Sequence, residues 1–203
     1  MTSTRVRLSP KVRRAQIVRS AIAVIAEVGY DAATFARIAQ HAGLGSTGLI
    51  SHHFDDRNEL MQEVIAAVSQ RADDFVEQRM SVETGPSAAL DAYITATIDF
   101  HARYPQLSAV VSAIRHKMPV PDGYSLLGVD VHEPEILRLQ QLMRRAQMLG
   151  EMAEFDTKIV AMSLHHTLEA ATSEIRAGRA DPDAWAAALV SLFASGTGQE
   201  TRR

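Results

Sequence analysis

Three glycines, Gly43, Gly45 and Gly48, follow one another in the order G-x-G-x-x-G. In a dinucleotide-binding loop this spacing lets the backbone approach a pyrophosphate. Such a loop follows a buried strand, and an acidic residue ends a second strand about twenty residues later. Here residues 35–42 have the apolar spacing of a helix, and Glu63, near the required distance, lies in another helical pattern. We therefore predict no nucleotide and no other cofactor.

The same glycines fit a helix-turn-helix, in which a short turn joins two helices at a steep angle and the second helix reads DNA. Thr34 can cap a short first helix, and Gly43 can end it. Leu44 is an apolar residue that the turn can bury, and Ser46 or Thr47 can cap the helix that follows. We therefore predict a recognition helix that starts at Ser46 or Thr47.

Apolar residues recur at three- and four-residue steps along most of the chain, which is the period of an α-helix. We predict an all-α fold of about nine helices, with no strand. Residues 116–134 contain three prolines and two glycines and have no clear period, so we predict a long loop there. The predicted helices cover residues 10–28, 35–42, a short segment after 46, 57–80, 87–104, 107–114, 135–149, 156–176 and 182–194.

Composition suits a folded protein, with 203 residues of which 46% are hydrophobic and 22% charged. There are 0 cysteines, which excludes disulfides, a thiol nucleophile and cysteine-ligated metals. No apolar run is long enough to span a membrane, and no apolar segment follows the basic N-terminus. We therefore predict a cytoplasmic protein with no membrane partner.

Charge is distributed unevenly, although the net charge is only −3. Residues 1–57 contain 8 basic and 4 acidic side chains, whereas the remaining residues contain 13 basic and 20 acidic ones. A basic end of this kind is typical of contact with a polyanion. We predict two domains, a DNA-binding domain over residues 1–57 that includes a basic arm, and a larger helical domain over residues 58–203.

Residues 11–66 resemble the N-terminal domain of TetR-family transcriptional repressors. The shared features are a first helix that ends in Gly29-Tyr30, the Thr34 that opens the second helix, the I-A-x-x-A-G turn, and the His53-Phe54 pair ahead of the fourth helix. The resemblance implies a homodimer whose recognition helices enter successive major grooves of double-stranded DNA. It also implies a C-terminal domain that dimerises and binds a small-molecule effector, and hence a ligand-responsive repressor.

The predicted DNA contacts come from the basic arm and the helix-turn-helix. The first 20 residues contain six basic side chains and no acidic one, which suits contact with phosphates, although a solvated tail has the same composition. The resemblance implies that Thr34 contacts a phosphate, and Arg57 matches a basic position of the family. The predicted DNA-contacting residues are Arg5, Arg7, Arg13, Arg14, Thr34, Arg37, Ser46, Thr47, Gly48, Ser51, His52 and Arg57.

The turn and the recognition helix depart from the family pattern at two places. The family turn has one residue fewer, so Gly45 is an insertion that leaves the register of the base contacts open. Ser51 and His52 replace aromatic residues that usually lie against the DNA backbone, and a histidine there can still donate a hydrogen bond to a phosphate. The stretch TGLISH, residues 47–52, resembles the choline-responsive BetI-like branch of the family.

The middle helices carry side chains of mixed polarity, which suit either an effector cavity or an ordinary core. The prediction that these side chains bind an effector depends on the family resemblance. The predicted effector-binding residues are Tyr93, Phe100, His101, Tyr104, Arg115, His116, Met118, Met143 and His165.

The last two helices carry apolar stripes wide enough for both a core and a partner surface. The resemblance implies a four-helix dimer interface, and an intramolecular bundle is the alternative. The predicted interface residues are Leu164, Leu168, Ala171, Ile175, Trp185, Leu189, Leu192 and Phe193.

Two other kinds of site are not expected. No pair of histidines has the i, i+4 spacing of a helical metal site, so we predict no metal. An all-helical enzyme, or a small-molecule-binding protein without a DNA-binding role, is the rival function. No Ser-His-Asp order, Walker loop or paired-carboxylate setting supports an enzyme, and we predict that the chain is not one.

Overall fold

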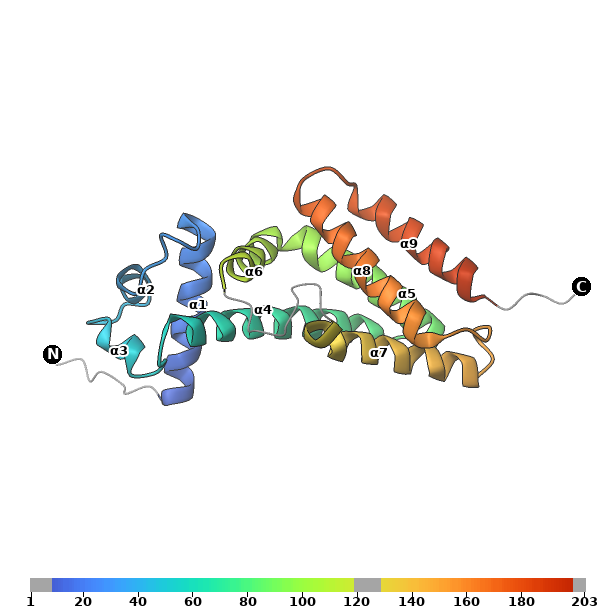
Figure 1. Ribbon diagram of the computed structural model, residues 1–203, viewed down its shortest axis with the longest axis horizontal. Coiled ribbons are helices and arrows are strands. Elements are labelled where there is room, and N and C mark those ends of the chain that lie inside the picture. Colours follow the sequence, from blue (N-terminus) through green and yellow to red (C-terminus); the bar gives the residue numbers. More distant parts are fainter. Residues whose placement is uncertain (1–8, 119–128, 199–203) are drawn as a thin grey trace, which may run out of the picture. The chain divides into compact units, whose positions relative to one another are not determined.

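The computed structural model describes residues 9–118 and 129–198, which form nine helices and no strand (Figure 1). The predicted all-α fold is therefore confirmed. The helices are α1 (Pro10–Val28), α2 (Phe35–His41), α3 (Gly48–Ser51), α4 (Arg57–Met80), α5 (Pro86–Arg103), α6 (Pro105–Lys117), α7 (Val129–Met148), α8 (Thr157–Arg176) and α9 (Pro182–Thr197).

Side-chain caps set the starts of several helices. Ser9 Oγ accepts a hydrogen bond from the backbone N–H of Val12 at the start of α1. Thr34 Oγ1 accepts from the N–H of Arg37, and Asp181 Oδ1 accepts from the N–H of Ala184. Each cap satisfies a backbone donor that the first helical turn leaves without a partner. Local capping therefore explains why α1, α2 and α9 begin where the sequence predicted.

The structure differs from the predictions at α3 and over residues 116–134. Thr47 stands at the N-cap position of α3 but makes no side-chain capping hydrogen bond, and α3 is only four residues long. The loop predicted over 116–134 is wrong at both ends, because α6 extends to Lys117 and α7 begins at Val129. Pro134 lies inside α7, where a proline removes one backbone hydrogen bond without ending the helix. Residues 119–128 of that predicted loop lie outside the described residues.

The chain divides into two compact units. Unit 1 contains the described residues up to Gln70 together with Gln106–Met118, and unit 2 contains Arg71–Pro105 and the described residues from Val129 onward. Unit 1 therefore holds α1 to α3, the first part of α4, and α6. The boundary near residue 57 stays a prediction.

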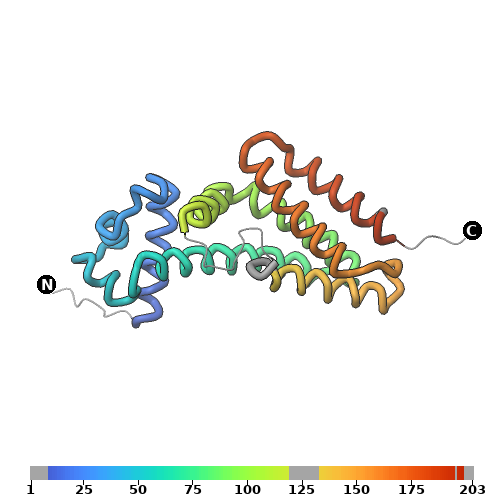
Figure 2. Tube along the Cα trace, in the orientation of Figure 1, coloured from blue at the N-terminus to red at the C-terminus, as the bar shows by residue number. Residues whose placement is uncertain are grey.

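Unit 1 is built around one apolar cluster. Ile17, Ile38, Ile50 and Leu60 bring α1 to α4 into this cluster, and α6 contributes Ile114. Figure 2 shows α6 beside α1, although the two helices are far apart in the sequence. At the end of α6, Lys117 Nζ forms an ion pair with Asp31 Oδ2 at 3.0 Å. Burial of this apolar surface therefore stabilises the helix-turn-helix and α6 together.

Unit 2 is a helical bundle in which α5 packs against α7, α8 and α9. Its buried cluster includes Leu90 and Ile94 of α5, Leu139 of α7 and Leu164 of α8. None of the described helices carries a stretch long and apolar enough to cross a membrane.

Candidate nucleic-acid interface

The turn after α2 has the geometry of a Schellman motif. Gly43 has φ of 63°, in the left-handed region that glycine adopts without strain. Its N–H donates to Gln40 O at 3.1 Å, and the N–H of Leu44 donates to Ala39 O at 2.9 Å. The Leu44 side chain packs against the apolar cluster of unit 1. The predictions that Gly43 ends the helix and that the turn buries Leu44 are therefore confirmed.

Small and polar residues line the outside of the turn and α3. Ile50 and Phe54 are buried and anchor this segment to the core. Gly45 to Gly48, Ser51 and His52 are exposed. Leu49 is 38% exposed, because in a helix of one turn only one side faces the core. We name Gly45–Gly48, Ser51 and His52 the α3 surface.

Thr34 and Arg37 at the start of α2 are also exposed. Arg13 is half-buried, and its Nη1 donates to Gln16 Oε1 at 2.7 Å. Two predicted contacts of the basic arm, Arg5 and Arg7, lie outside the described residues.

Arg14 is engaged in contacts within unit 1. Its Nη1 donates to the carbonyl oxygen of His53, and its Nη2 contacts Glu59 Oε1 at 2.8 Å and Glu63 Oε1 at 2.9 Å. The guanidinium also lies 4.3 Å from the centre of the Phe54 ring. The hydrogen bond to Glu59 is the main cause of the raised pKa of Arg14. Arg14 therefore connects α1 to the end of α3 and to α4.

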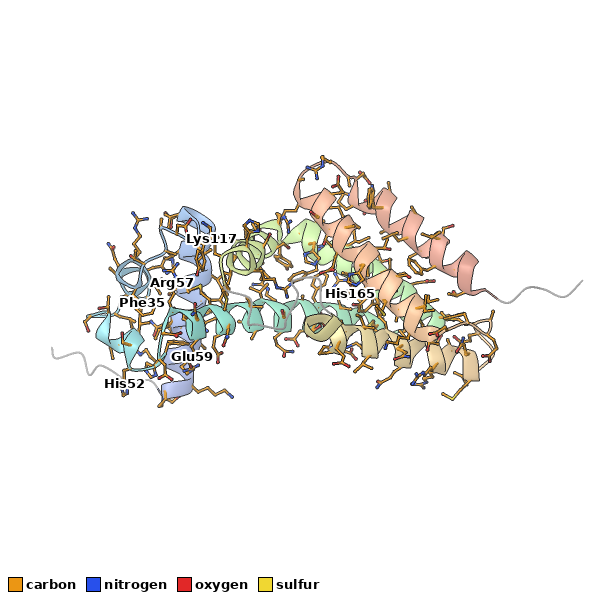
Figure 3. All side chains as sticks on the ribbon, in the orientation of Figure 1. Phe35, His52, Arg57, Glu59, Lys117 and His165 are labelled. Atoms are coloured by element: carbon orange, nitrogen blue, oxygen red, sulfur yellow. The ribbon has the colours of Figure 1, made fainter. Side chains whose placement is uncertain are left out.

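Arg57, at the start of α4, is likewise engaged in contacts within unit 1. Its Nη1 donates to Ala33 O at 2.9 Å, and its Nη2 donates to Tyr30 O at 2.5 Å. The guanidinium lies 4.5 Å from the centre of the Tyr30 ring. Figure 3 shows Arg57 among the helices of unit 1 and His52 at its outer edge. Arg57 therefore holds the α1–α2 loop against α4.

The two adjacent histidines after α3 lie in different environments. His52 is exposed and His53 is half-buried. Burial is the main cause of the lowered pKa of His53, and His52 and Arg14 contribute further. The neutral form of His53 is therefore favoured, whereas His52 is open to a partner.

The predicted effector-binding residues fall in both units. Arg115, His116 and Met118 belong to unit 1, and the other six belong to unit 2. Within unit 2, Met143 is fully buried and Phe100 is 1% exposed. The ring of Tyr104 lies 5.2 Å from that of Phe100, and the ring of His101 lies 5.5 Å from it. The structure thus brings Phe100, His101 and Tyr104 together as an aromatic cluster.

A group of charged side chains near Tyr93 was not predicted from the sequence. Arg138 Nη1 and Asp73 Oδ1 form an ion pair at 3.4 Å between α7 and α4. Burial, followed by the charge of Glu135, raises the pKa of Tyr93 to about 12. The sequence feature that could have indicated this group is the presence of three charged residues, Asp73, Glu135 and Arg138, among the apolar residues of their helices.

His101, a half-buried histidine of unit 2, makes stability depend on pH. Burial, followed by the charge of Arg176, lowers the pKa of His101 from 6.5 to about 4. The histidine therefore binds a proton more readily in the unfolded chain than in the folded one. The contribution of His101 to the free energy of unfolding is fully present above pH 6.5 and is lost as the pH falls from 6.5 toward 4. We expect His101 to cost about 2 kcal/mol of unfolding free energy between pH 7.5 and about pH 5.

Urea denaturation at these two pH values measures this loss. His101→Gln, which has a similar size and does not titrate, should lose less stability than the unmodified chain on acidification. An equal loss in the two proteins would contradict a lowered His101 pKa.

The predicted dimer residues have mixed exposure in the single chain. Leu164, Leu168, Ala171 and Leu189 are buried in the core of unit 2. Ile175, Trp185 and Phe193 are half-buried, and Leu192 is 60% exposed. The first four therefore serve the intramolecular core, and the exposed side of the stripe is available to a partner.

Known proteins are similar to this chain in sequence and in fold. Residues 17–64 match the family of bacterial regulatory proteins, tetR family. The HTH-type transcriptional regulator BetI of Escherichia coli O17:K52:H18 (strain UMN026 / ExPEC) is 29% identical over 149 residues, which cover 73% of this chain and 70% of BetI.

Solved structures share the fold over nearly the whole chain. A TetR-family transcriptional regulator from Pectobacterium atrosepticum has a TM-score of 0.73 at 22% identity, with 98% of this chain and 100% of that chain covered. The transcriptional regulator FadR from Bacillus subtilis, in complex with stearoyl-CoA, has a TM-score of 0.73 at 19% identity, with 90% and 98% covered.

The family match covers the helices that build the α3 surface. The relatives are transcription factors and not enzymes, so the rival prediction of an all-helical enzyme is set aside. The chain is a DNA-binding transcriptional regulator whose residues 17–64 match the tetR family of bacterial regulatory proteins.

Proposed function

We propose that this regulator is a repressor that binds a pseudo-palindromic operator as a dimer and is released by a small-molecule effector. The observation that carries the DNA-binding part is the α3 surface. Its glycines leave room for close approach to a DNA backbone, and the hydroxyls of Ser46, Thr47 and Ser51 can reach phosphates or base edges. The exposed Thr34 and Arg37 extend the same interface.

Arg14 and Arg57 position this interface in our proposal. Their guanidinium groups already contact backbone carbonyls, and Arg14 also contacts two carboxylates. These contacts fix the end of α3 and the α1–α2 loop relative to α4. Arg5, Arg7 and Arg13 remain proposed phosphate contacts of the arm. Because the proposed target is chromosomal DNA, we propose that the protein acts in the cytoplasm.

The test of the operator proposal is fluorescence anisotropy with the DNA upstream of the protein's own gene. Measurements at two salt concentrations separate specific from non-specific binding, since phosphate contacts release counterions and weaken as salt rises. Binding to this DNA should exceed binding to random DNA by at least about a thousandfold. Equal affinities for the two DNAs would contradict repression of the protein's own gene.

An effector is proposed for unit 2, where the aromatic cluster of Phe100, His101 and Tyr104 lies. The similar FadR from Bacillus subtilis was solved in complex with stearoyl-CoA, which supports a small-molecule ligand for this fold. A ligand that binds only the folded chain raises its melting temperature. Thermal-shift measurements with stearoyl-CoA and with choline test two candidates, and a true effector must also release the operator.

The proposed dimer joins α8 and α9 of two chains. Ile159 is 63% exposed and Leu192 is 60% exposed, so both helices carry apolar side chains on the surface of the single chain. Burying such side chains between copies is favourable. We expect sedimentation velocity to show a dimer at micromolar concentration, and Leu192→Glu to shift the protein toward monomer.

Val82→Glu is the matched control for this change. Val82 is 75% exposed and follows α4, away from both helices in sequence, so its change should leave the dimer intact. An unmodified chain that remains monomeric at micromolar concentration would contradict the two-fold operator model.

A further inference from the structure

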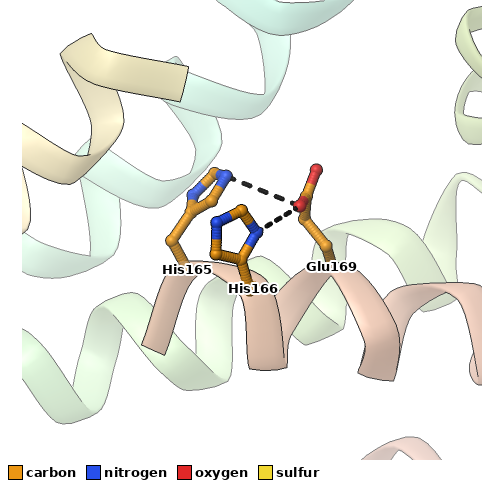
Figure 4. Close-up of side chains that lie close together, drawn as sticks. All are labelled: His165, His166 and Glu169. Atoms are coloured by element: carbon orange, nitrogen blue, oxygen red, sulfur yellow. Dashed lines mark hydrogen bonds and ion pairs between the residues drawn. The ribbon is translucent and has the colours of Figure 1, made fainter. Parts of the chain in front are cut away.

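Three metal-ligating side chains meet on one stretch of α8. Figure 4 shows the carboxylate of Glu169 next to the rings of His165 and His166. His166 Nδ1 lies 3.0 Å from Glu169 Oε2, and His165 Nε2 lies 3.8 Å from the same oxygen. One ligand atom from each residue lies within 4.8 Å of those of the other two. We name these three residues the α8 cluster.

Helix geometry explains why the three side chains converge. Residues three and four positions apart lie on the same side of a helix, so Glu169 reaches His166 at i, i+3 and His165 at i, i+4. The prediction that the chain has no metal site considered the two histidines of this helix but not Glu169, which stands four residues after His165. A helix that is packed into the core through Leu164 and Leu168 presents these ligands on a fixed scaffold.

The distances fit a small divalent ion after minor side-chain adjustment. Zinc binds imidazole nitrogen and carboxylate oxygen at about 2.0 to 2.2 Å, so tetrahedral ligands lie about 3.4 Å from one another. The two observed distances, 3.0 Å and 3.8 Å, lie on either side of that value. An ion could therefore contact all three atoms through rotation about side-chain bonds, without movement of the helix.

Exposure of the cluster permits an ion to enter from solvent. The His165 side chain is 11% exposed, whereas those of His166 and Glu169 are 40% and 41% exposed. One ligand is thus held within the protein, and two face outward. Two imidazoles and one carboxylate form a ligand set that suits zinc and neighbouring divalent transition metals rather than calcium or magnesium.

We propose that the α8 cluster is a site for a divalent transition-metal ion, with His165 Nε2, His166 Nδ1 and Glu169 Oε2 as its protein ligands. Three protein ligands leave at least one coordination position for water or another ligand. The site is separate from the α3 surface and does not rest on the proposed repressor function.

Isothermal titration of the full-length, EDTA-treated protein with zinc chloride tests the site in the absence of DNA. We expect one zinc ion per chain, and Glu169→Gln and His166→Ala should each weaken zinc binding at least about tenfold because each removes a direct ligand. Cobalt(II) in place of zinc should give visible absorption bands of a tetrahedral site, and both variants should lose them. These two side chains are partly exposed, and circular dichroism verifies that the variants remain helical.

Two variants provide matched controls. Glu174→Gln removes a carboxylate from the same helix that pairs with Arg179 instead, and His41→Ala removes an exposed histidine of α2. Both should bind zinc as the unmodified chain does. Absence of zinc binding, or equal weakening in Glu174→Gln and Glu169→Gln, would show that the cluster is only a pair of helix-stabilising contacts and would overturn the proposal. Operator affinity, measured with and without EDTA, reports separately on the proposed repressor function.

Discussion

Replacing Gly48 with glutamate is expected to abolish specific operator binding while leaving the fold intact. A Cβ added at Gly48 would meet only Ser46 Oγ, at 3.5 Å, and Gly48 is not in a left-handed conformation. The folded chain can therefore accept a side chain there. In the proposed complex, however, that side chain would place a carboxylate against the DNA backbone and prevent close approach.

The size of this effect follows from the proposed symmetry. A dimer carries the substitution in both half-sites, and each unfavourable contact costs about 2 kcal/mol. We expect operator affinity to fall by about a thousandfold, toward that for random DNA. Fluorescence anisotropy measures the affinity, and thermal unfolding verifies the fold.

Ala66→Glu is the control for charge. Ala66 is exposed on the part of α4 that belongs to unit 1, so this variant adds the same carboxylate to the same unit away from the α3 surface. Its operator affinity should fall far less. If Gly48→Glu binds the operator as tightly as the unmodified chain, the start of α3 does not face DNA.

Replacing Phe54 with alanine is expected to destabilise unit 1 by about 3 to 5 kcal/mol. The Phe54 side chain is 1% exposed, lies in the apolar cluster of unit 1, and carries the Arg14 guanidinium over its ring. Its removal leaves a cavity and takes away the surface on which Arg14 rests. Urea denaturation followed by circular dichroism measures the loss.

Leu49→Ala distinguishes this prediction from a general sensitivity of the α3 region. Leu49 is 38% exposed, so its truncation removes much less buried surface and should cost under about 1 kcal/mol. Similar losses in both variants would contradict the assignment of Phe54 as the anchor of α3. Operator binding by Phe54→Ala should weaken as well, because α3 loses its support.

The sequence by itself determined the helical class, most helix boundaries and the place of the turn. α1 has the predicted bounds because Ser9 and Pro10 start it and Gly29 ends it, and these are local effects of capping and backbone freedom. The end of α2 at Gly43 is a local effect of the same kind. The basic N-terminal composition and the apolar face of α2 then sufficed to favour a DNA-binding motif over a nucleotide loop.

Tertiary structure decided which charged and polar side chains are available. From the sequence, Arg14 and Arg57 were predicted to contact DNA. In the structure they contact carbonyl oxygens and aromatic rings instead. These partners come close only when the helices of unit 1 pack together. Likewise, α7 continues through Pro134, although a proline by itself disfavours the interior of a helix. Contacts across distant segments depend on packing, and spacing along the chain does not encode them.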